Sequence, residues 1–183
     1  MLYAVQKSAF SAFSYQILNE QRQAIGQLIL PDFPLAKNAR LKGLIPAGLS
    51  TVTSFELLGE VYEITFEYLN RQWVNDIRFN LLHDGVTLAT VDVVSANSRS
   101  SGHKPLINRK SIIMTRPFDA QLMKRNRFFG ALYELIVNQQ VVGKIVEAKF
   151  ITVKRQVTID LPNSISSPIQ VFLFYLMQNR AYN

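Results

Sequence analysis

The sequence contains no cysteine, which excludes disulfide cross-links, thiol nucleophiles and thiolate metal sites and fits a reducing compartment. It has only two histidines, His83 in an expected turn and His103 in an expected loop, where neither is well held for proton transfer. It also lacks the HExxH, Walker A, GxGxxG and GxSxG patterns. We therefore predict no catalytic site and no cofactor.

A long hydrophobic run is also missing. The one continuous apolar stretch, 169–177 (IQVFLFYLM), is about half the roughly 20 residues that a membrane-spanning helix needs, so it indicates a buried core helix. The N-terminal residues MLYAVQKSAFSAFSYQI lack a basic start followed by an unbroken apolar stretch, because Gln6, Lys7 and Ser8 interrupt them. These two features predict a cytoplasmic protein.

The composition is that of a folded protein. Of the 183 residues, 48% are hydrophobic and 18% are charged, well away from the composition of disordered chains. A chain of this length can bury a core without disulfides or metal. We predict one domain spanning residues 1–183.

Two-residue periodicity dominates the chain and predicts strands. In residues 60–68 (EVYEITFEY), aromatic and aliphatic side chains alternate with Glu and Thr, as in a sheet with one face in water. Asp84-Gly85 supplies the positive φ angles of a tight hairpin turn, and a strand returns over 86–94. Further strands are predicted at 14–19, 24–30, 51–58, 73–82, 128–138, 141–150 and 151–161. Short turns between consecutive strands favour a meander.

Two stretches lack this periodicity. Residues 31–48, with three prolines, and residues 95–110, rich in Ser, Asn and basic residues, are predicted to be surface loops. Pro117 could begin a short helix over 119–125.

The C-terminal segment has the pattern of a helix. Ser166 or Ser167 can cap its N-terminus and Pro168 suits its first turn, which predicts a helix over 167–180. Apolar residues go almost all the way round this helix instead of forming one stripe. A helix of this kind must be enclosed on all sides, and in a small β protein the sheet would enclose it.

Two distant stretches share a pattern. Tyr15-Gln-Ile17 is followed by Ile25-Gly26, and Tyr133-Glu-Leu135 is followed by Val142-Gly143, so each reads as a hairpin. This repeat predicts two related meander halves, which can close into a barrel without exposed edges. The alternative is a β-sandwich or roll with one helix packed on one face.

Three features together resemble the tubby C-terminal-like superfamily, which includes the tubby domain, the LURP-one-related proteins and the phospholipid scramblases. They are the hairpin over 133–145, the following strand with Ile159-Asp160-Leu161, and the terminal SPIQVFLFYLMQNRAY. The resemblance implies a twelve-stranded barrel with a hydrophobic helix through its centre. For the tubby branch it also implies phosphoinositide binding through basic residues.

The net charge of +7 is concentrated in one segment. From residue 98 to residue 127 the chain contains eight Lys or Arg residues and one acid, Asp119, whereas the rest contains twelve of each sign. A basic segment of this kind favours an anionic partner. The residues predicted to bind an anion or a lipid head group are Lys104, Arg109, Lys110, Arg116, Lys124, Arg125 and Arg127.

We therefore expect a non-enzymatic domain that binds anionic phospholipid at a membrane surface. A solvated basic loop that serves solubility is the simplest alternative. Others are a barrel for a small apolar ligand, an unrecognised hydrolase, and a nucleic-acid-binding domain, against which the scarcity of aromatics among the cations argues. Asp76, Asp84 and Asp92 surround one hairpin without a neighbouring His, so we predict no metal site there. The sequence identifies no protein partner.

Overall fold

The computed structural model describes residues 1–7, 14–30, 53–69, 76–95, 110–125, 130–148 and 155–178. Within these ranges the chain forms twelve strands and one helix. The strands are β1 (Leu2–Gln6), β2 (Ser14–Leu18), β3 (Ala24–Ile29), β4 (Thr53–Leu57), β5 (Glu60–Tyr68), β6 (Ile77–His83), β7 (Val86–Ser95), β8 (Lys110–Arg116), β9 (Ala120–Arg125), β10 (Leu132–Val137), β11 (Gln140–Glu147) and β12 (Gln156–Asp160); the helix is α1 (Ser167–Gln178).

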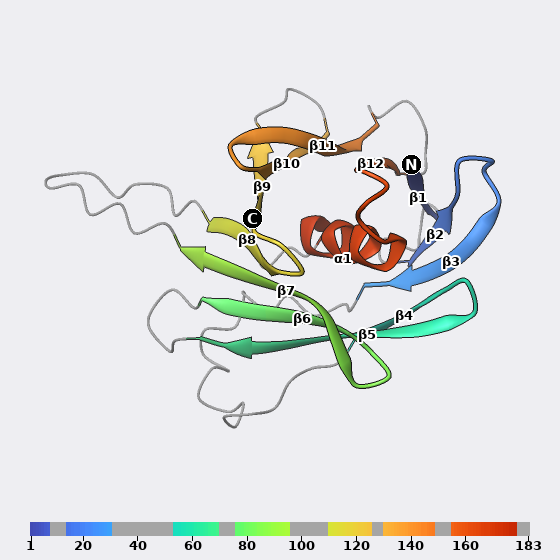
Figure 1. The fold of residues 1–183 in the computed structure, drawn as a ribbon. Helices are drawn as coiled ribbons and strands as arrows, with labels where there is room; N and C mark the ends of the chain where they lie inside the picture. The colour runs from blue at the N-terminus through green and yellow to red at the C-terminus, as the bar shows by residue number, and fades with distance from the viewer. Residues whose placement is uncertain are drawn as a thin grey trace, which may run out of the picture.

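The strands form a closed antiparallel barrel, and each strand pairs with its neighbours in sequence (Figure 1). The ring closes between the first and the last strand, where Leu2 pairs with Ile159 and Val5 pairs with Gln156. Closure leaves no unpaired sheet edge, so every strand has two partners. The predicted barrel is confirmed, and the sandwich or roll is not the fold.

Helix α1 lies inside this barrel (Figure 1). Every residue from Ile169 to Met177 is buried, which confirms that a helix apolar on all sides is enclosed on all sides. Phe174 packs edge-to-face on Tyr15 of β2, with ring centroids 5.1 Å apart, and Tyr175 packs on Phe79 of β6 at 6.3 Å. The helix therefore contacts well-separated strands of the ring and forms the centre of the core.

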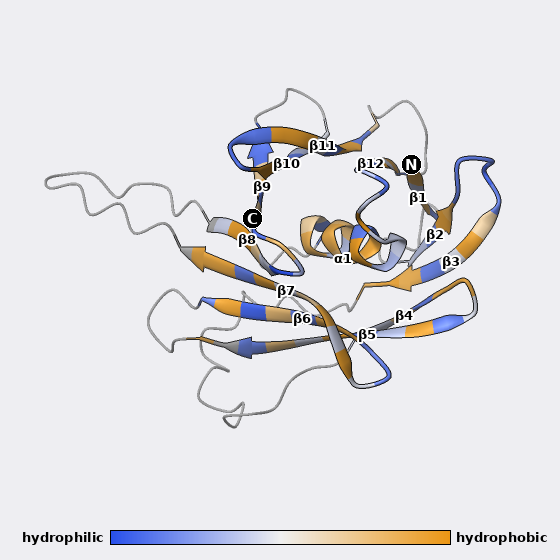
Figure 2. Cartoon of the chain, viewed as in Figure 1, coloured by the Kyte–Doolittle hydropathy of each residue, from blue (hydrophilic) through white to orange (hydrophobic). Residues whose placement is uncertain are grey.

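Hydrophobic and hydrophilic residues alternate along the strands (Figure 2), and in β6 and β12 the buried positions of this alternation are apolar. Strand β5 has the predicted bounds, and the predicted turn has left-handed backbone angles, with φ of 48° at Asp84 and 75° at Gly85. The other strand predictions are also confirmed. Most of these strands are shorter than predicted, but β7 continues to Ser95, β6 continues to His83 and β11 begins at Gln140. The predicted helix is confirmed over 167–178; residues 179 and 180 lie outside the described ranges.

The prediction of a short helix over 119–125 is wrong, because this segment is strand β9. Ala120 and Leu122 are buried, and β9 pairs with β8 and β10 on its two sides. These pairing partners, which local sequence does not reveal, stabilise a strand with weak β propensity. Strands β1 and β8 were not predicted either, although both contain residues of high β propensity, such as Val5, Ile112 and Ile113. The two predicted loops, 31–48 and 95–110, lie outside the described residues except for Ser95 and Lys110.

The repeated hairpins have matching registers. Gly26 pairs with Ile17 and Gly143 pairs with Leu135, and in both hairpins the register shifts at the next residue. A Cβ atom on Gly26 would lie 2.3 Å from the carbonyl oxygen of Glu56, and one on Gly143 would lie 2.8 Å from that of Asp160. Both positions therefore require glycine because the next strand passes too close for a side chain.

Candidate functional site

The two ends of the barrel differ in how the strands are joined. An antiparallel meander reverses at each turn, so alternate connections come to the same end. At one end of the barrel, which we call the short-turn rim, the connections between strands are two to five residues long. At the other end, which we call the long-connection rim, they are six to 23 residues long. The barrel therefore has one rim of tight hairpin turns and one rim to which the long connections are attached.

The charge of the chain is segregated between these rims. The segments within the long connections that lie outside the described residues, 8–13, 31–52, 70–75, 96–109, 126–129 and 149–154, contain ten Lys or Arg residues and one acid. The described turns and strand ends at the short-turn rim, in contrast, contain five carboxylates and two arginines. Those carboxylates belong to Glu20, Glu60, Asp84, Asp119 and Asp160. The connections that start and end at the long-connection rim are thus rich in cations by composition, and the described part of the short-turn rim is acidic.

Three of the predicted binding residues can be placed at the long-connection rim. Lys110 begins β8 there, and Lys124 and Arg125 end β9 there. Arg116, at the other end of β8, lies at the short-turn rim, about 20 Å away along a strand of seven residues. The structure therefore does not bring Arg116 together with the other predicted residues. Lys104, Arg109 and Arg127 lie outside the described residues.

The cations at this rim have different surroundings. The Nε atom of Arg125 donates a hydrogen bond to Oε2 of Glu134 at 2.7 Å, which partly neutralises its charge. The Nε atom of Arg155 lies 3.5 Å from Oε1 of Glu147, a buried carboxylate that also accepts a hydrogen bond from the backbone of Ala131. Lys124 is exposed. The two arginines at this rim thus each lie beside a carboxylate.

Sequence reasoning did not group the cations of the other long connections, which lie far from residue 98 in sequence and outside the described residues: Lys37, Arg40, Lys42, Arg71, Lys149 and Lys154. The twelve basic and twelve acidic residues outside 98–127 appear balanced in a linear count. The imbalance between basic and acidic residues becomes visible only when alternate connections along the chain are grouped together, because these join strands at the same end of the barrel. The meander expected from the sequence lacked β1 and β8, so its connections could not be assigned to the correct ends of the barrel.

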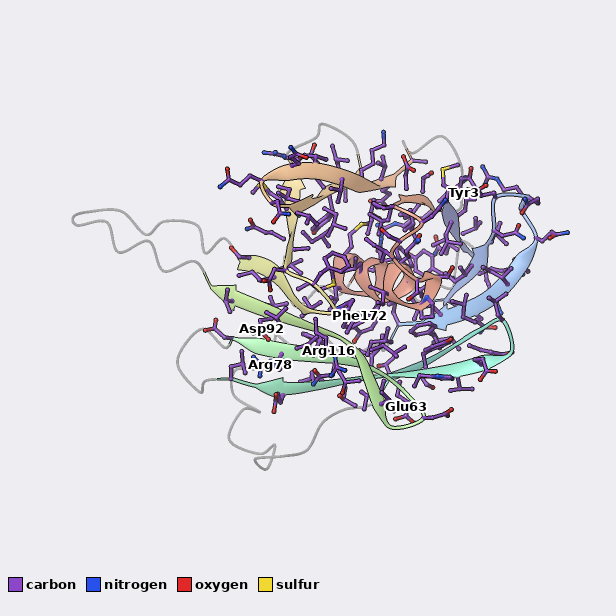
Figure 3. All side chains as sticks on the ribbon, viewed as in Figure 1. Tyr3, Glu63, Arg78, Asp92, Arg116 and Phe172 are labelled. Atoms are coloured by element: carbon purple, nitrogen blue, oxygen red, sulfur yellow. The ribbon has the colours of Figure 1, made fainter. Side chains whose placement is uncertain are left out.

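The described residues show no catalytic constellation. His83 stacks on Tyr62, with ring centroids 4.7 Å apart, and its Nε2 atom lies 3.2 Å from Oε2 of Glu60. Asp92 accepts two hydrogen bonds from Arg78, at 2.7 and 2.9 Å, and the two side chains point toward each other on the barrel wall (Figure 3). Within the described ranges no group of three acidic or imidazole side chains could hold a metal ion.

Two further findings bear on function. In the described part of the chain, no helix is long and apolar enough to cross a membrane. No protein-family model, no curated protein and no solved structure matches this sequence or its fold.

Proposed function

We propose that this chain is a non-enzymatic, cytoplasmic binding domain that docks on anionic phospholipid head groups through its long-connection rim. The observation that carries the proposal is the segregation of charge: ten cations and one acid in the undescribed segments attached to one rim, and five carboxylates and two arginines at the other. A membrane surface with negative potential attracts the first rim and repels the second. The barrel would therefore approach the surface in one orientation.

The energetics are sufficient for reversible binding. Each Lys or Arg near an anionic surface contributes about 1 kcal/mol, so four or five cations in contact correspond to roughly millimolar to sub-millimolar affinity. The same undescribed segments contain six phenylalanines and the only tryptophan, Trp73. Aromatic side chains of this kind strengthen binding at the head-group level. Charge and aromatic anchors together favour a peripheral membrane domain.

The architecture also supports this proposal over the interior-ligand alternative. The side chains of α1 occupy the barrel interior, including fully buried Phe172 (Figure 3), where a small apolar ligand would need space. A barrel around a C-terminal hydrophobic helix is what the resemblance to the tubby-like superfamily implied. Phosphoinositides, which that resemblance implies for the tubby branch, are the first lipids to test.

Liposome co-sedimentation tests the proposal. We expect binding to vesicles containing phosphatidylserine or phosphoinositide, no binding to phosphatidylcholine vesicles, and loss of binding between about 0.1 and 0.5 M salt. Replacing Lys104 and Arg109 with glutamine should weaken binding about 30-fold, because each cation contributes about 1 kcal/mol. The matched control replaces Arg116 and Lys144, which removes the same charge away from this rim and should change binding by less than about twofold.

Two results would contradict the proposal. Equal losses in both double variants would mean that total charge, and not the rim, determines binding. Tighter binding to a single-stranded oligonucleotide than to anionic vesicles, measured by fluorescence anisotropy at the same salt concentration, would identify nucleic acid as the anionic partner.

A further inference from the structure

An open groove of about 430 Å³ lies on the outer wall of the barrel near the short-turn rim. It is lined by residues 24–27 of β3, by Glu56 of β4, and by Leu58 and Gly59 of the β4–β5 turn. The backbone N–H of Leu58 donates a hydrogen bond to the carbonyl of Ile25 at 2.7 Å, which holds the turn against β3. The volume is within the range of ligand pockets.

Leu58 is not the residue that this turn requires. Its φ angle is 56°, a left-handed conformation that favours Asn, Asp or Gly and is unfavourable for a bulky side chain. Its side chain is 68% exposed, so it gains little from the core. Val61 of the same hairpin and Val86 of the next hairpin are also more than half exposed. Leu58 thus has an unfavourable backbone conformation and an exposed apolar side chain, and neither stabilises the fold. A residue of this kind indicates a function.

The groove and its surroundings are acidic. Glu56 pairs in register with exposed Val61 on one side and with Gln27 on the other, and Oε1 of Gln27 accepts a hydrogen bond from Nζ of Lys7. Glu56 itself has no ion pair within the described part of the chain. Glu60, Glu63 and Asp84 lie on the same two hairpins, whose described residues 56–63 and 82–87 include no Lys or Arg. The pKa of Tyr62 is raised above its usual value. Burial is the largest cause, followed by the negative charges of Glu60 and Asp84.

A second groove of about 340 Å³ lies at the equivalent place in the repeat, beside Gly143. There Asp160 takes the place of Glu56, but its register partner is Lys144 instead of a neutral glutamine. Pro162, which follows Asp160 by two residues, takes the place of Leu58. Two backbones of the same design thus differ in where the lysine lies, in register with the carboxylate in one and on the neighbouring glutamine in the other, and in the exposed leucine. The fold therefore does not require the exposed leucine.

We propose that the first groove, which is lined by Gly26, Glu56 and Leu58, binds a segment of a partner protein that carries a Lys or Arg next to an apolar residue. The cation would pair with Glu56, and the apolar side chain would pack on Leu58 and Val61. Charge complementarity identifies this occupant: the groove offers exposed apolar surface beside Glu56, which has no ion pair within the described part of the chain, and the nearby Lys7 ammonium is bound to Gln27 instead. The groove lies toward the rim opposite the lipid-binding face, so the barrel could bind both at once.

Selection from a phage-displayed library of random twelve-residue peptides on the immobilised full chain tests this inference. We expect enrichment of peptides in which Lys or Arg lies within two positions of Leu, Ile, Val or Phe. In fluorescence anisotropy, Leu58→Asn and Glu56→Gln should each weaken an enriched peptide about tenfold, as interface anchors do. Gln27→Lys, which introduces the pairing of the second groove, should have a similar effect. The control Asp160→Asn should change affinity by less than about twofold.

Folding does not confound the test, because Asn suits the left-handed turn better than Leu and Leu58→Asn should melt at or above the wild-type temperature. This variant should also bind anionic vesicles like the wild type, which separates this proposal from the lipid-binding one. Three results would overturn the inference: no enrichment, enriched peptides without the basic-apolar pattern, and affinities that Leu58→Asn and Glu56→Gln leave unchanged. Wild-type self-association that Leu58→Asn abolishes would also overturn it, by showing that a second copy covers the groove.

Discussion

Truncation of Phe174 to alanine tests whether α1 is the centre of the core. The Phe174 side chain is fully buried inside the barrel, and its ring meets that of Tyr15 edge-to-face at 5.1 Å. Removing a buried phenylalanine side chain costs about 3–5 kcal/mol, which includes the cavity left behind. Typical domains have about 5–15 kcal/mol of stability in total. The substitution should therefore remove a large part of the free energy of unfolding.

Urea denaturation followed by circular dichroism gives the free energy, and a thermal melt should show a decrease of about 6–20 °C in Tm for a chain of this size. Val141→Ala, at a side chain that is 55% exposed, is the control and should cost less than about 1 kcal/mol. A double-mutant cycle with Tyr15→Leu and Phe174→Leu should give a coupling of about 0.5–1.5 kcal/mol for the ring pair. A loss below about 1 kcal/mol in Phe174→Ala would refute the central position of the helix.

Two other substitutions test the barrel wall. Gly143→Ala should destabilise the protein by about 1–3 kcal/mol in urea denaturation, because the added Cβ would lie 2.8 Å from the Asp160 carbonyl oxygen; an unchanged midpoint would mean that β11 and β12 separate easily. Burial raises the pKa of Tyr133 above 10.0, so the folded state keeps this proton to higher pH than the unfolded state. Stability from this group is present below pH 10 and is lost as pH rises above it. Wild type should therefore lose stability relative to Tyr133→Phe between pH 10 and 11, and parallel pH profiles would contradict this.

Local sequence was sufficient for the elements whose signal is strong. The alternation in β5, the Asp84-Gly85 turn and the all-round apolarity of α1 each reflect a constraint that acts within a few residues. The all-round apolarity of the helix predicted more than its own structure, because only a closed sheet can cover such a helix on every side. Strand β9 has no comparable signal, since it is stabilised by the strands on either side.

For the candidate sites, what the sequence determines and what only the tertiary structure determines are more clearly separate than for the fold. The sequence by itself determined the net charge, the concentration of cations in 98–127 and the absence of a catalytic motif. Only the tertiary structure decided that Arg116 lies apart from Lys124, and that all the long connections begin and end at one rim. The same holds for the groove, which needs β3 beside the β4–β5 turn. A linear count contains no information on which end of a strand a charge occupies, because that depends on the direction in which the folded chain crosses the barrel.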